Sequence, residues 1–563
     1  MAEKKLLVMK FGGTSVKDAE MVKTVAGIVK KKIDEGYSPI LVCSAMGKTT
    51  NKLIDAGERA LGEGLAATFS PKLRPSAFST TVTKNGVEEG AGLPPPLPNA
   101  SSFAATSPQL QPGGAASGSD WRKVIRKVGE TLLTELREHH REAAAELQVS
   151  TELLDQIEDL LDGCASLLTG IRLLRDISSR TRDTLMSYGE RMSVRMVAGH
   201  LQSVGIEADA VDSWDIGLIT GSGCGSAFAD KGAELLPDVP ERIQEALGCL
   251  REPEAPVRVP VVTGFIAKDL NGVITTLGRG GSDFSAAVIG AAVGAAEIEI
   301  WTDVDGIFTS DPRIVPEAFS VPSLTFLQAA ELAYFGAKVL HPRTIQPAMG
   351  KGIPVRVKNT FNAEHPGTVI VQSKEKFPRQ PGPEKPRSRM MSEEQIQTEL
   401  GRKVTGITHK SGVIMMEIYS EMMLGQHGFL SKVFEIFGDT GISVDVIATS
   451  EVSVSLTLDQ GVQESAVVQA SEKLRKFADV KIDRGMSLLT VICNTTYSSS
   501  ILGVVCNAFH ELGIIVEMVS CGASKINISF VIRAEKAELE RSLRAIHALF
   551  FAEKKQIAEF IGH

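Results

Sequence analysis

Hydrophobic residues follow two different periods in the first part of the chain. Residues 6–11 and 40–45 are short and almost uninterrupted apolar runs, which is typical of strands buried on both faces. Between them, apolar residues recur every three to four positions over 21–33, which predicts an amphipathic helix. A strand, a helix and a second strand in this order predict a parallel α/β sheet.

The same alternation returns further along the chain. Helical periodicity covers residues 121–199, and apolar runs at 257–262, 298–302 and 353–357 predict more buried strands. The fold class we expect is therefore α/β, with a parallel-rich central sheet sandwiched by helices.

Two stretches interrupt this pattern. Residues 70–119 are rich in Pro, Gly, Ser, Ala and Thr and have no apolar period, which predicts a disordered insertion. It is either a tolerated surface loop or a regulatory docking segment. Residues 373–403 form a second polar, Pro-rich stretch and predict a linker. We therefore expect a first domain over 1–372.

The remainder of the chain contains an internal repeat. Residues 429–446 and 501–518 share an amphipathic helix, a glycine suited to a left-handed cap and an apolar strand. An alternating strand follows each copy. The repeat predicts two small βαβ units, over 404–480 and 481–563. They are either packing units alone, or hold a zwitterionic ligand where strand ends meet helix N-termini.

Composition narrows the class of protein. The chain has 563 residues, 43% of them hydrophobic and 23% charged, as in an ordinary globular protein of two or three domains. A net charge of -8 argues against a nucleic-acid binder, and no apolar run is long enough to predict a membrane span. The seven cysteines are scattered, which argues against structural zinc and favours a reducing compartment.

The end of the first strand carries candidate chemistry. Lys10, Phe11, Gly12 and Gly13 are followed by two hydroxyl residues, a composition that suits phosphate groups because it combines a cation with backbone amides that approach closely. A tight turn without function would also explain the glycines. By contrast, Gly47-Lys48-Thr49 is not a P-loop, because Val42 stands where that motif requires glycine.

Two later segments add candidate residues. In 276–283, Arg279 and three glycines precede Asp283 at a strand-to-helix junction, where helix amides bind an anion and arginine binds a carboxylate. Asp283 alone would also be explained as a capping residue. Residues 300–313 combine a strand, an acidic turn and Asp-Pro-Arg, which indicates a nucleotide-binding edge or an ordinary hairpin turn.

Together these segments resemble aspartate kinases of the amino acid kinase superfamily. Residues 10–15, 187–193, 276–283, 301–313 and 338–342 occur in the order typical of that family. The C-terminal repeat resembles its tandem ACT domains, and residues 423–426 and 529–532 resemble the plant-type monofunctional enzymes. The resemblance covers the chain except the insertion and the linker.

The resemblance implies a catalytic set and an ATP site. Lys10 would contact the transferring phosphoryl group, with the Gly12 and Gly13 amides beside it, and Asp283 would organise Lys10 and a second lysine, Lys338. Since the substrate nucleophile is an ionised carboxylate, no general base is needed. Phe308 stands where the family often has tyrosine. The implied ATP-binding residues are Lys10, Gly12, Gly13, Thr302, Asp303, Phe308, Arg313 and Lys338.

The resemblance also implies the amino acid site. Arg279 would bind the α-carboxylate, Glu190 the α-ammonium group, and Ser44 and Thr50 would complete the pocket with hydroxyl contacts. Taken singly, Glu190 could be a surface helix residue and the hydroxyls ordinary caps. Mg²⁺ is implied only by the polyphosphate, with no protein ligand cluster and no tightly bound prosthetic group.

A lysine-effector site is implied in the first ACT copy. Asp445 and Glu451 would supply carboxylates for the second ammonium of lysine, unless these residues serve only a dimerising sandwich. The matching residues are Met423, Gln426, Phe429, Leu430, Ser443, Val444, Asp445, Ser450 and Glu451.

The sequence therefore predicts an aspartate kinase that converts ATP and L-aspartate to 4-phospho-L-aspartate and is inhibited by lysine. The alternatives are another amino acid kinase, or a catalytically inactive ACT-domain sensor. A homodimer through the ACT domains is expected, with neither nucleic acid nor membrane as partner. The plant-type resemblance implies the plastid stroma, with the transit peptide absent from this chain, and otherwise the cytoplasm.

Overall fold

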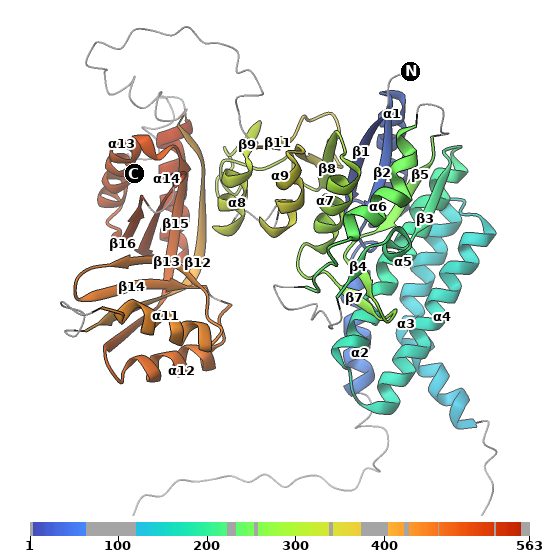
Figure 1. The fold of residues 1–563 in the computed structure, drawn as a ribbon, viewed down its shortest axis with the longest axis horizontal. Coiled ribbons are helices and arrows are strands. Elements are labelled where there is room, and N and C mark those ends of the chain that lie inside the picture. Colours follow the sequence, from blue (N-terminus) through green and yellow to red (C-terminus); the bar gives the residue numbers. More distant parts are fainter. Residues whose placement is uncertain are drawn as a thin grey trace, which may run out of the picture.

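The computed structural model describes most of the chain (Figure 1). Several predicted features lie outside the described residues. They are the insertion 70–119, residues 373–402 of the linker 373–403, and the single residues Lys338, Met423 and Gln426. The described residues are 4–62, 120–221, 232–252, 257–336, 340, 342–372, 403–420, 427–459, 461–522 and 525–552.

An eight-stranded sheet forms the centre of the N-terminal part. Its strand order is β3-β5-β2-β1-β8-β10-β11-β9, with the first six strands parallel and β11 antiparallel to β10. The predicted parallel-rich α/β fold is confirmed. The strands are β1 (Lys5–Phe11), β2 (Tyr37–Cys43), β3 (Ala208–Val211), β5 (Val259–Thr263), β8 (Glu297–Thr302), β9 (Ser323–Thr325), β10 (Val355–Asn359) and β11 (Thr368–Val371); β4 (Ile219–Thr220), β6 (Ile266–Asp269) and β7 (Ile274–Thr276) form a small second sheet.

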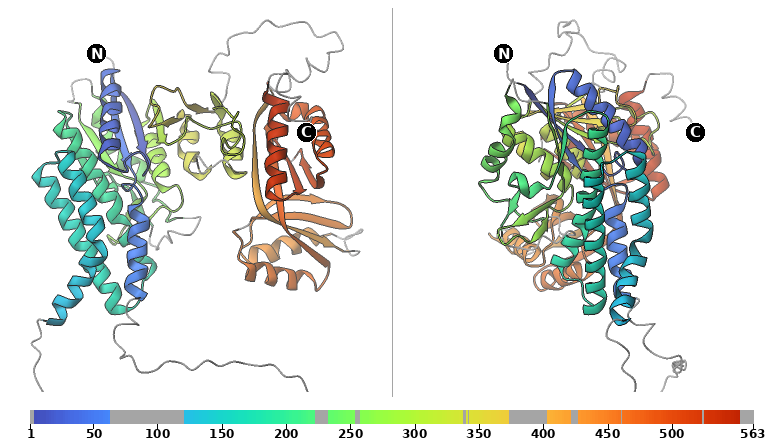
Figure 2. Two further views of the ribbon diagram at one scale, coloured as in Figure 1. Left: turned by 180° about the vertical axis from the view of Figure 1, so that it is seen from behind. Right: turned by 90° about the vertical axis from the view of Figure 1, so that its right-hand side faces the viewer.

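Successive residues of β1 enter different hydrophobic cores, because side chains alternate between the faces of a strand. Leu7, Met9 and Phe11 pack in the core beneath α1 and α5, whereas Leu6 and Val8 pack beneath α6 and α7. Long helices cover the first face (Figure 2). On that side lie α1 (Ala19–Asp34), α2 (Thr49–Gly62), α3 (Asp120–Glu146), α4 (Thr151–Leu174) and α5 (Ser179–Ser203); the second core takes residues from α6 (Val239–Leu247), α7 (Gly281–Val293), α8 (Phe326–Tyr334) and α9 (Gln346–Lys351).

Local hydrogen bonds fix where several helices begin. The Asp18 side chain accepts from the Met21 amide at 2.9 Å, which caps α1. Ser178 caps α5 in the same way. Thr325 and Gln328 form a reciprocal capping box at the start of α8. Each cap satisfies backbone donors that have no partner within the helix.

The C-terminal repeat forms one antiparallel sheet with the order β13-β14-β12-β15-β17-β16 (Figure 1). Two long strands, β12 and β15, pair with each other and belong to both copies. The boundary expected between residues 480 and 481 falls inside β15. The elements are β12 (Val404–Tyr419), α11 (Phe429–Asp439), β13 (Val444–Thr449), β14 (Ser453–Leu458), α12 (Glu464–Leu474), β15 (Asp479–Cys493), α13 (Ser498–Glu511), β16 (Ile515–Cys521), β17 (Asn527–Arg533) and α14 (Lys536–Phe551).

One glycine divides each of the two long strands into halves. Gly412 in β12 has φ 72° and Gly485 in β15 has φ 75°, and the strand pairing shifts register around them. Val404 and Ile407, before Gly412, pack in the core of the second copy, whereas Ile414 beyond it packs in the core of the first copy. The first half of β12 is therefore part of the second unit, although it precedes the first unit in the chain.

The two parts of the molecule meet where α8 lies against β12. The Gln328 side chain donates to the Thr405 hydroxyl at 3.0 Å, and the Asn527 amide donates to Glu331 at 2.6 Å. Gly336, just after α8, has φ 125°, and a Cβ there would lie 2.2 Å from the carbonyl oxygen of His409. Only glycine permits this approach of the two backbones.

Candidate functional site

A pocket of about 630 Å³ opens at the carboxyl edge of the central sheet. It is lined by residues from the ends of β1, β2 and β5 and from the first turns of α2 and α7. The chain runs from β1 to β2 on one side and places β8 on the other, so the pocket lies beside the switch in strand order. Open parallel sheets bind ligands at this position.

The pocket brings together most of the predicted catalytic and amino acid residues. Lys48, Asn51, Phe265 and Ser282 also line it and were missed. Lys48 and Ser282 belong to the glycine-containing segments 47–49 and 276–283, whereas Phe265 has no signal in the sequence. Its φ of 70° marks it in the structure. The predicted residues that line the pocket are Lys10, Gly13, Ser44, Thr50, Glu190, Arg279 and Asp283.

Lys10 and Asp283 form an ion pair within the pocket. The Lys10 Nζ lies 2.6 Å from Asp283 Oδ1, and the two side chains are only 12% and 13% exposed. Asp283 is in the first turn of α7, where the helix dipole favours a carboxylate. The pair therefore holds a cation at a fixed place at the end of β1.

Gly12 and Gly13, which follow Phe11, make contacts within the fold that the sequence did not predict. The Gly12 amide donates to the carbonyl of Trp301 at 3.2 Å, so it is engaged within the fold. A Cβ on Gly13 would lie 2.8 Å from the carbonyl oxygen of Gly47 and 3.0 Å from that of Ala45. Gly13 therefore allows the loops after β1 and β2 to pack together, a steric reason in addition to phosphate approach.

Glu190 is a buried carboxyl group whose charge is not balanced by a described cation. Its residue is 3% exposed on α5, the Ala45 amide and the Thr50 hydroxyl donate to it, and its Oε2 has no hydrogen-bond partner among the described residues. Burial raises the pKa of Glu190 to about 8, which these hydrogen bonds partly offset. A cationic ligand group would compensate this carboxylate.

The rest of the pocket favours anionic groups. Arg279 is exposed in the turn before α7, and Lys48 is exposed just before α2. The N-termini of both helices line the pocket. The Ser44 hydroxyl donates to that of Ser282 at 3.0 Å, which joins the β2 loop to α7.

The predicted nucleotide residues are only partly near this pocket. Thr302 is the last residue of β8 and Asp303 follows it; β8 pairs with β1 directly beside Lys10. Phe308, however, packs against the core of the second repeat copy, and Arg313 is 73% exposed and pairs with Asp311 at 2.6 Å. Neither Phe308 nor Arg313 lines the pocket.

The predicted effector residues do not share one environment. Phe429 is 9% exposed and packs edge-to-face on Phe477 in the core of the first copy, and Val444 is half-buried against the same core. Asp445 is already engaged by Tyr334 and Lys410. The exposed members of the predicted set are Leu430, Ser443, Ser450 and Glu451.

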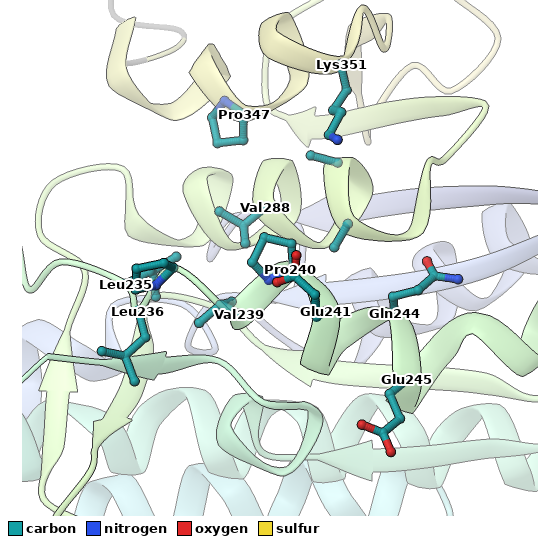
Figure 3. A pocket seen from close by; sticks show the side chains of 13 residues that line it. Leu235, Leu236, Val239, Pro240, Glu241, Gln244, Glu245, Val288, Pro347 and Lys351 are labelled. Atoms are coloured by element: carbon teal, nitrogen blue, oxygen red, sulfur yellow. The ribbon is translucent and has the colours of Figure 1, made fainter.

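Another pocket, of about 680 Å³, lies between α6, α7 and α9 (Figure 3). Val239, Pro240, Val288 and Pro347 give it apolar walls, and Lys351 lies at one side. None of the predicted catalytic, substrate or effector residues lines it. It therefore carries no candidate chemistry for the predicted reaction.

A second buried carboxyl group lies on α5, seven residues before Glu190. Asp183 is 1% exposed; its Oδ1 accepts from the Thr276 hydroxyl at 3.1 Å, and its Oδ2 has no hydrogen-bond partner in the described part of the chain. Burial raises the pKa of Asp183 to about 7. Asp183 thus joins the helix of Glu190 to the strand that leads to Arg279.

Metal and membrane features are absent from the described residues. No group of three or more His, Cys, Asp and Glu side chains there is arranged to hold a metal ion. No described helix is both long enough and apolar enough to cross a bilayer.

Comparisons with known proteins give the family. Residues 5–359 match the model of the amino acid kinase family, and residues 416–474 and 498–550 match an ACT domain model. Aspartokinase 2 of Arabidopsis thaliana, named as chloroplastic, is 40% identical over 97% of this chain and 84% of its own length. Aspartokinase of Saccharomyces cerevisiae is 32% identical over 74% of this chain and 77% of its own length.

Two solved structures are similar along nearly the whole chain. Escherichia coli aspartokinase III in complex with aspartate and ADP, in its R-state, is 27% identical with a TM-score of 0.67 and covers 97% of this chain and 100% of that one. The same enzyme with lysine and aspartate, in its T-state, is 26% identical with a TM-score of 0.64 and covers 97% and 99%.

Asp183→Asn should raise thermal stability above pH 7 but not below pH 4. Because its pKa is raised in the folded protein, Asp183 costs no stability below its unfolded pKa of about 3.8, and the cost grows until the pH passes about 7. The difference in melting temperature between variant and parent should therefore increase by roughly 2–4 °C from pH 5 to pH 8. A pH-independent difference would show that Asp183 does not titrate in the fold.

Proposed function

The chain belongs to the aspartokinases of the amino acid kinase family, and from this membership we propose which residues transfer the phosphoryl group of ATP to L-aspartate. The activity is that of an aspartate kinase, with 4-phospho-L-aspartate as product. The observation that carries the residue assignment is the single pocket in which the Lys10–Asp283 pair, Glu190 and Arg279 converge.

The nucleophile is the side-chain carboxylate of aspartate, with a reference pKa of about 3.9, so it is ionised at neutral pH. The protein does not need to remove a proton from it. Its task is to bring two anions together and to neutralise charge on the transferring group. Lys10 supplies that cation, and Asp283 keeps it oriented when no phosphate is present. By the family resemblance, Lys338 would be the second cation.

The amino acid backbone of the substrate is held at the other end of the pocket. Glu190 takes the α-ammonium group, which restores charge balance to a carboxylate buried without a described cation. Arg279 takes the α-carboxylate in a bidentate contact. Ser44 and Thr50 contribute hydroxyl groups beside them. These contacts leave the side-chain carboxylate as the end free to react.

ATP is the phosphoryl donor, consistent with the ADP complex of the Escherichia coli relative. Thr302 and Asp303 at the end of β8 are its nearest predicted contacts, adjacent to β1. Mg²⁺ would be held through the phosphate oxygens, where it neutralises their charge, because the described residues offer no carboxylate cluster for it.

Two alternatives are disfavoured. Another amino acid kinase, such as one that acts on glutamate, is disfavoured because an aspartokinase matches 97% of this chain, the ACT units included. A catalytically inactive sensor would have no reason to keep the Lys10–Asp283 pair partly buried at a cost in desolvation.

Regulation by lysine follows from the first ACT copy. The T-state structure of the Escherichia coli relative contains lysine. In this chain, the exposed Ser443 directly precedes the strand that carries Asp445, and the exposed Ser450 and Glu451 directly follow it. We propose that lysine binds there and inhibits, which requires that it bind the inactive state more tightly than the active one.

Assembly and location are proposed from surface features and relatives. Leu430 and Phe434 on α11 and Ile447 on the edge strand β13 are 39%, 42% and 36% exposed, which suits a homodimer contact through the first copy.

The similarity to three chloroplastic aspartokinases of Arabidopsis thaliana supports a plastid location.

Purified protein should consume ATP when L-aspartate is supplied and not when L-glutamate replaces it. Lys10→Met should lower kcat at least about 1000-fold because charge neutralisation at the transferring group is lost. A coupled assay of ADP release measures both. Lys351→Met, an exposed lysine outside the site, is the matched control. Normal turnover by Lys10→Met would refute the assignment.

Glu190→Gln should raise KM for L-aspartate about 100-fold, with a much smaller effect on KM for ATP. Because Glu190 must be ionised to bind the ammonium group and its pKa is about 8, kcat/KM for aspartate should rise in the parent from pH 6.5 to pH 8.5. That rise should be missing in Glu190→Gln. If kcat/KM for aspartate depended on pH in the same way in the parent and in Glu190→Gln, Glu190 would be excluded as the titrating group.

Initial rates should fall as L-lysine is added, and L-leucine, which lacks the second ammonium group, should have no effect at equal concentration. Glu451→Gln should weaken inhibition about fivefold while leaving kcat unchanged. Uninhibited turnover at millimolar lysine would refute the regulatory proposal and leave the kinase assignment intact.

A further inference from the structure

Asp445 has both carboxylate oxygens occupied. The Tyr334 hydroxyl donates to Oδ1 at 2.5 Å, and the Lys410 Nζ lies 3.2 Å from Oδ2. The Asp445 side chain is only 3% exposed. A ligand ammonium group cannot reach this carboxylate without displacing one of the two partners.

Lys410 is the better held of the two partners. Its Nζ also lies 3.2 Å from Asp459, so it is shared between two carboxylates, and it sits 4.4 Å from the centre of the Tyr334 ring. Tyr334 is a neutral donor with one such bond, and the partial burial of its phenol beside Asp445 raises the pKa of that phenol, which keeps it protonated. The phenol is therefore the partner that an incoming cation replaces more readily.

Tyr334 belongs to the catalytic part of the molecule. It is the last residue of α8, and the residues after it are fixed on β12: Thr408 donates its hydroxyl to the Phe335 carbonyl, and Gly336 packs on His409. In the sequence, Lys338 follows Tyr334 by four positions. The Tyr334–Asp445 bond thus joins the proposed effector strand to the last residue of a helix in the amino acid kinase part of the chain.

We infer that Asp445 has two alternative partners, the Tyr334 hydroxyl in the active enzyme and an ammonium group of the effector in the inhibited one. Binding of lysine breaks the bond between β13 and α8. This inference rests on the proposed lysine site. It supplies a contact that differs between the active and the inhibited enzyme. Without such a difference, lysine could not shift the equilibrium between these two states.

Reciprocity defines the expected effect of removing the phenol. If lysine binding costs the Tyr334–Asp445 bond, that bond opposes lysine binding by the same free energy. Tyr334→Phe keeps the ring and its contact with Lys410 but leaves one Asp445 oxygen available. Lysine should therefore bind more tightly to the variant.

The experiment measures inhibition and binding of L-lysine on the full chain. Tyr334→Phe should lower both the half-inhibitory concentration and the calorimetric Kd about tenfold, with kcat and both KM values unchanged. Tyr419→Phe is the matched control, since Tyr419 is also an exposed tyrosine that donates to a carboxylate, here Glu417 at 3.3 Å on its own strand. It should not alter the response to lysine.

Each other outcome counts against the inference in a distinguishable way. If Asp445→Asn abolishes lysine binding but Tyr334→Phe leaves it unchanged or weakens it, the exchange is refuted and the lysine site stands. If the parent protein neither binds nor responds to lysine, the regulatory proposal fails and the inference fails with it. Melting temperatures of all variants exclude unfolding as the cause.

Discussion

The ion pair between Lys10 and Asp283 is the interaction on which the site depends. It joins the end of β1 to the first turn of α7 across a distance of 2.6 Å. Each element is fixed independently of the other. Two parallel neighbouring strands hold β1, and the side chains that α7 contributes to the second core hold α7. A flexible lysine is therefore held in one place before any phosphate arrives, which reduces the entropy lost when the reaction begins.

The remaining site residues are arranged around that pair by the same two kinds of element. Strand ends supply Ser44 and the glycines, and helix first turns supply Thr50 and Asp283. Glu190 differs because it lies in the middle of a long helix and is fully enclosed. Its burial raises its pKa and makes the empty pocket electrostatically unfavourable, so a substrate cation gains more there than on an exposed carboxylate.

The sequence identified the residues that converge in the candidate site better than it predicted how the parts of the chain pack together. Periodicity located the strands and α7, and the order of motifs gathered Lys10, Glu190, Arg279 and Asp283, because these residues belong to short segments with strong local chemistry. Phe265 could not be found, since its position depends on backbone strain created by packing. The sharing of β12 and β15 also escaped prediction, because a repeat in sequence does not reveal which half of a strand packs with which copy.

The paired glycines at Gly412 and Gly485 have a consequence for recombining this protein with its relatives. They mark the two points at which the first ACT unit enters and leaves the shared sheet, so in the chain this unit is inserted within the second one and does not simply precede it. A chimera joined between residues 480 and 481 would carry mismatched halves of β15. One that exchanged the segment between the glycines would transplant a complete module. The contacts of α8 with Thr405 and of Phe335 with Thr408 would stay with the parent, whereas the Tyr334–Asp445 bond would join parent and transplant.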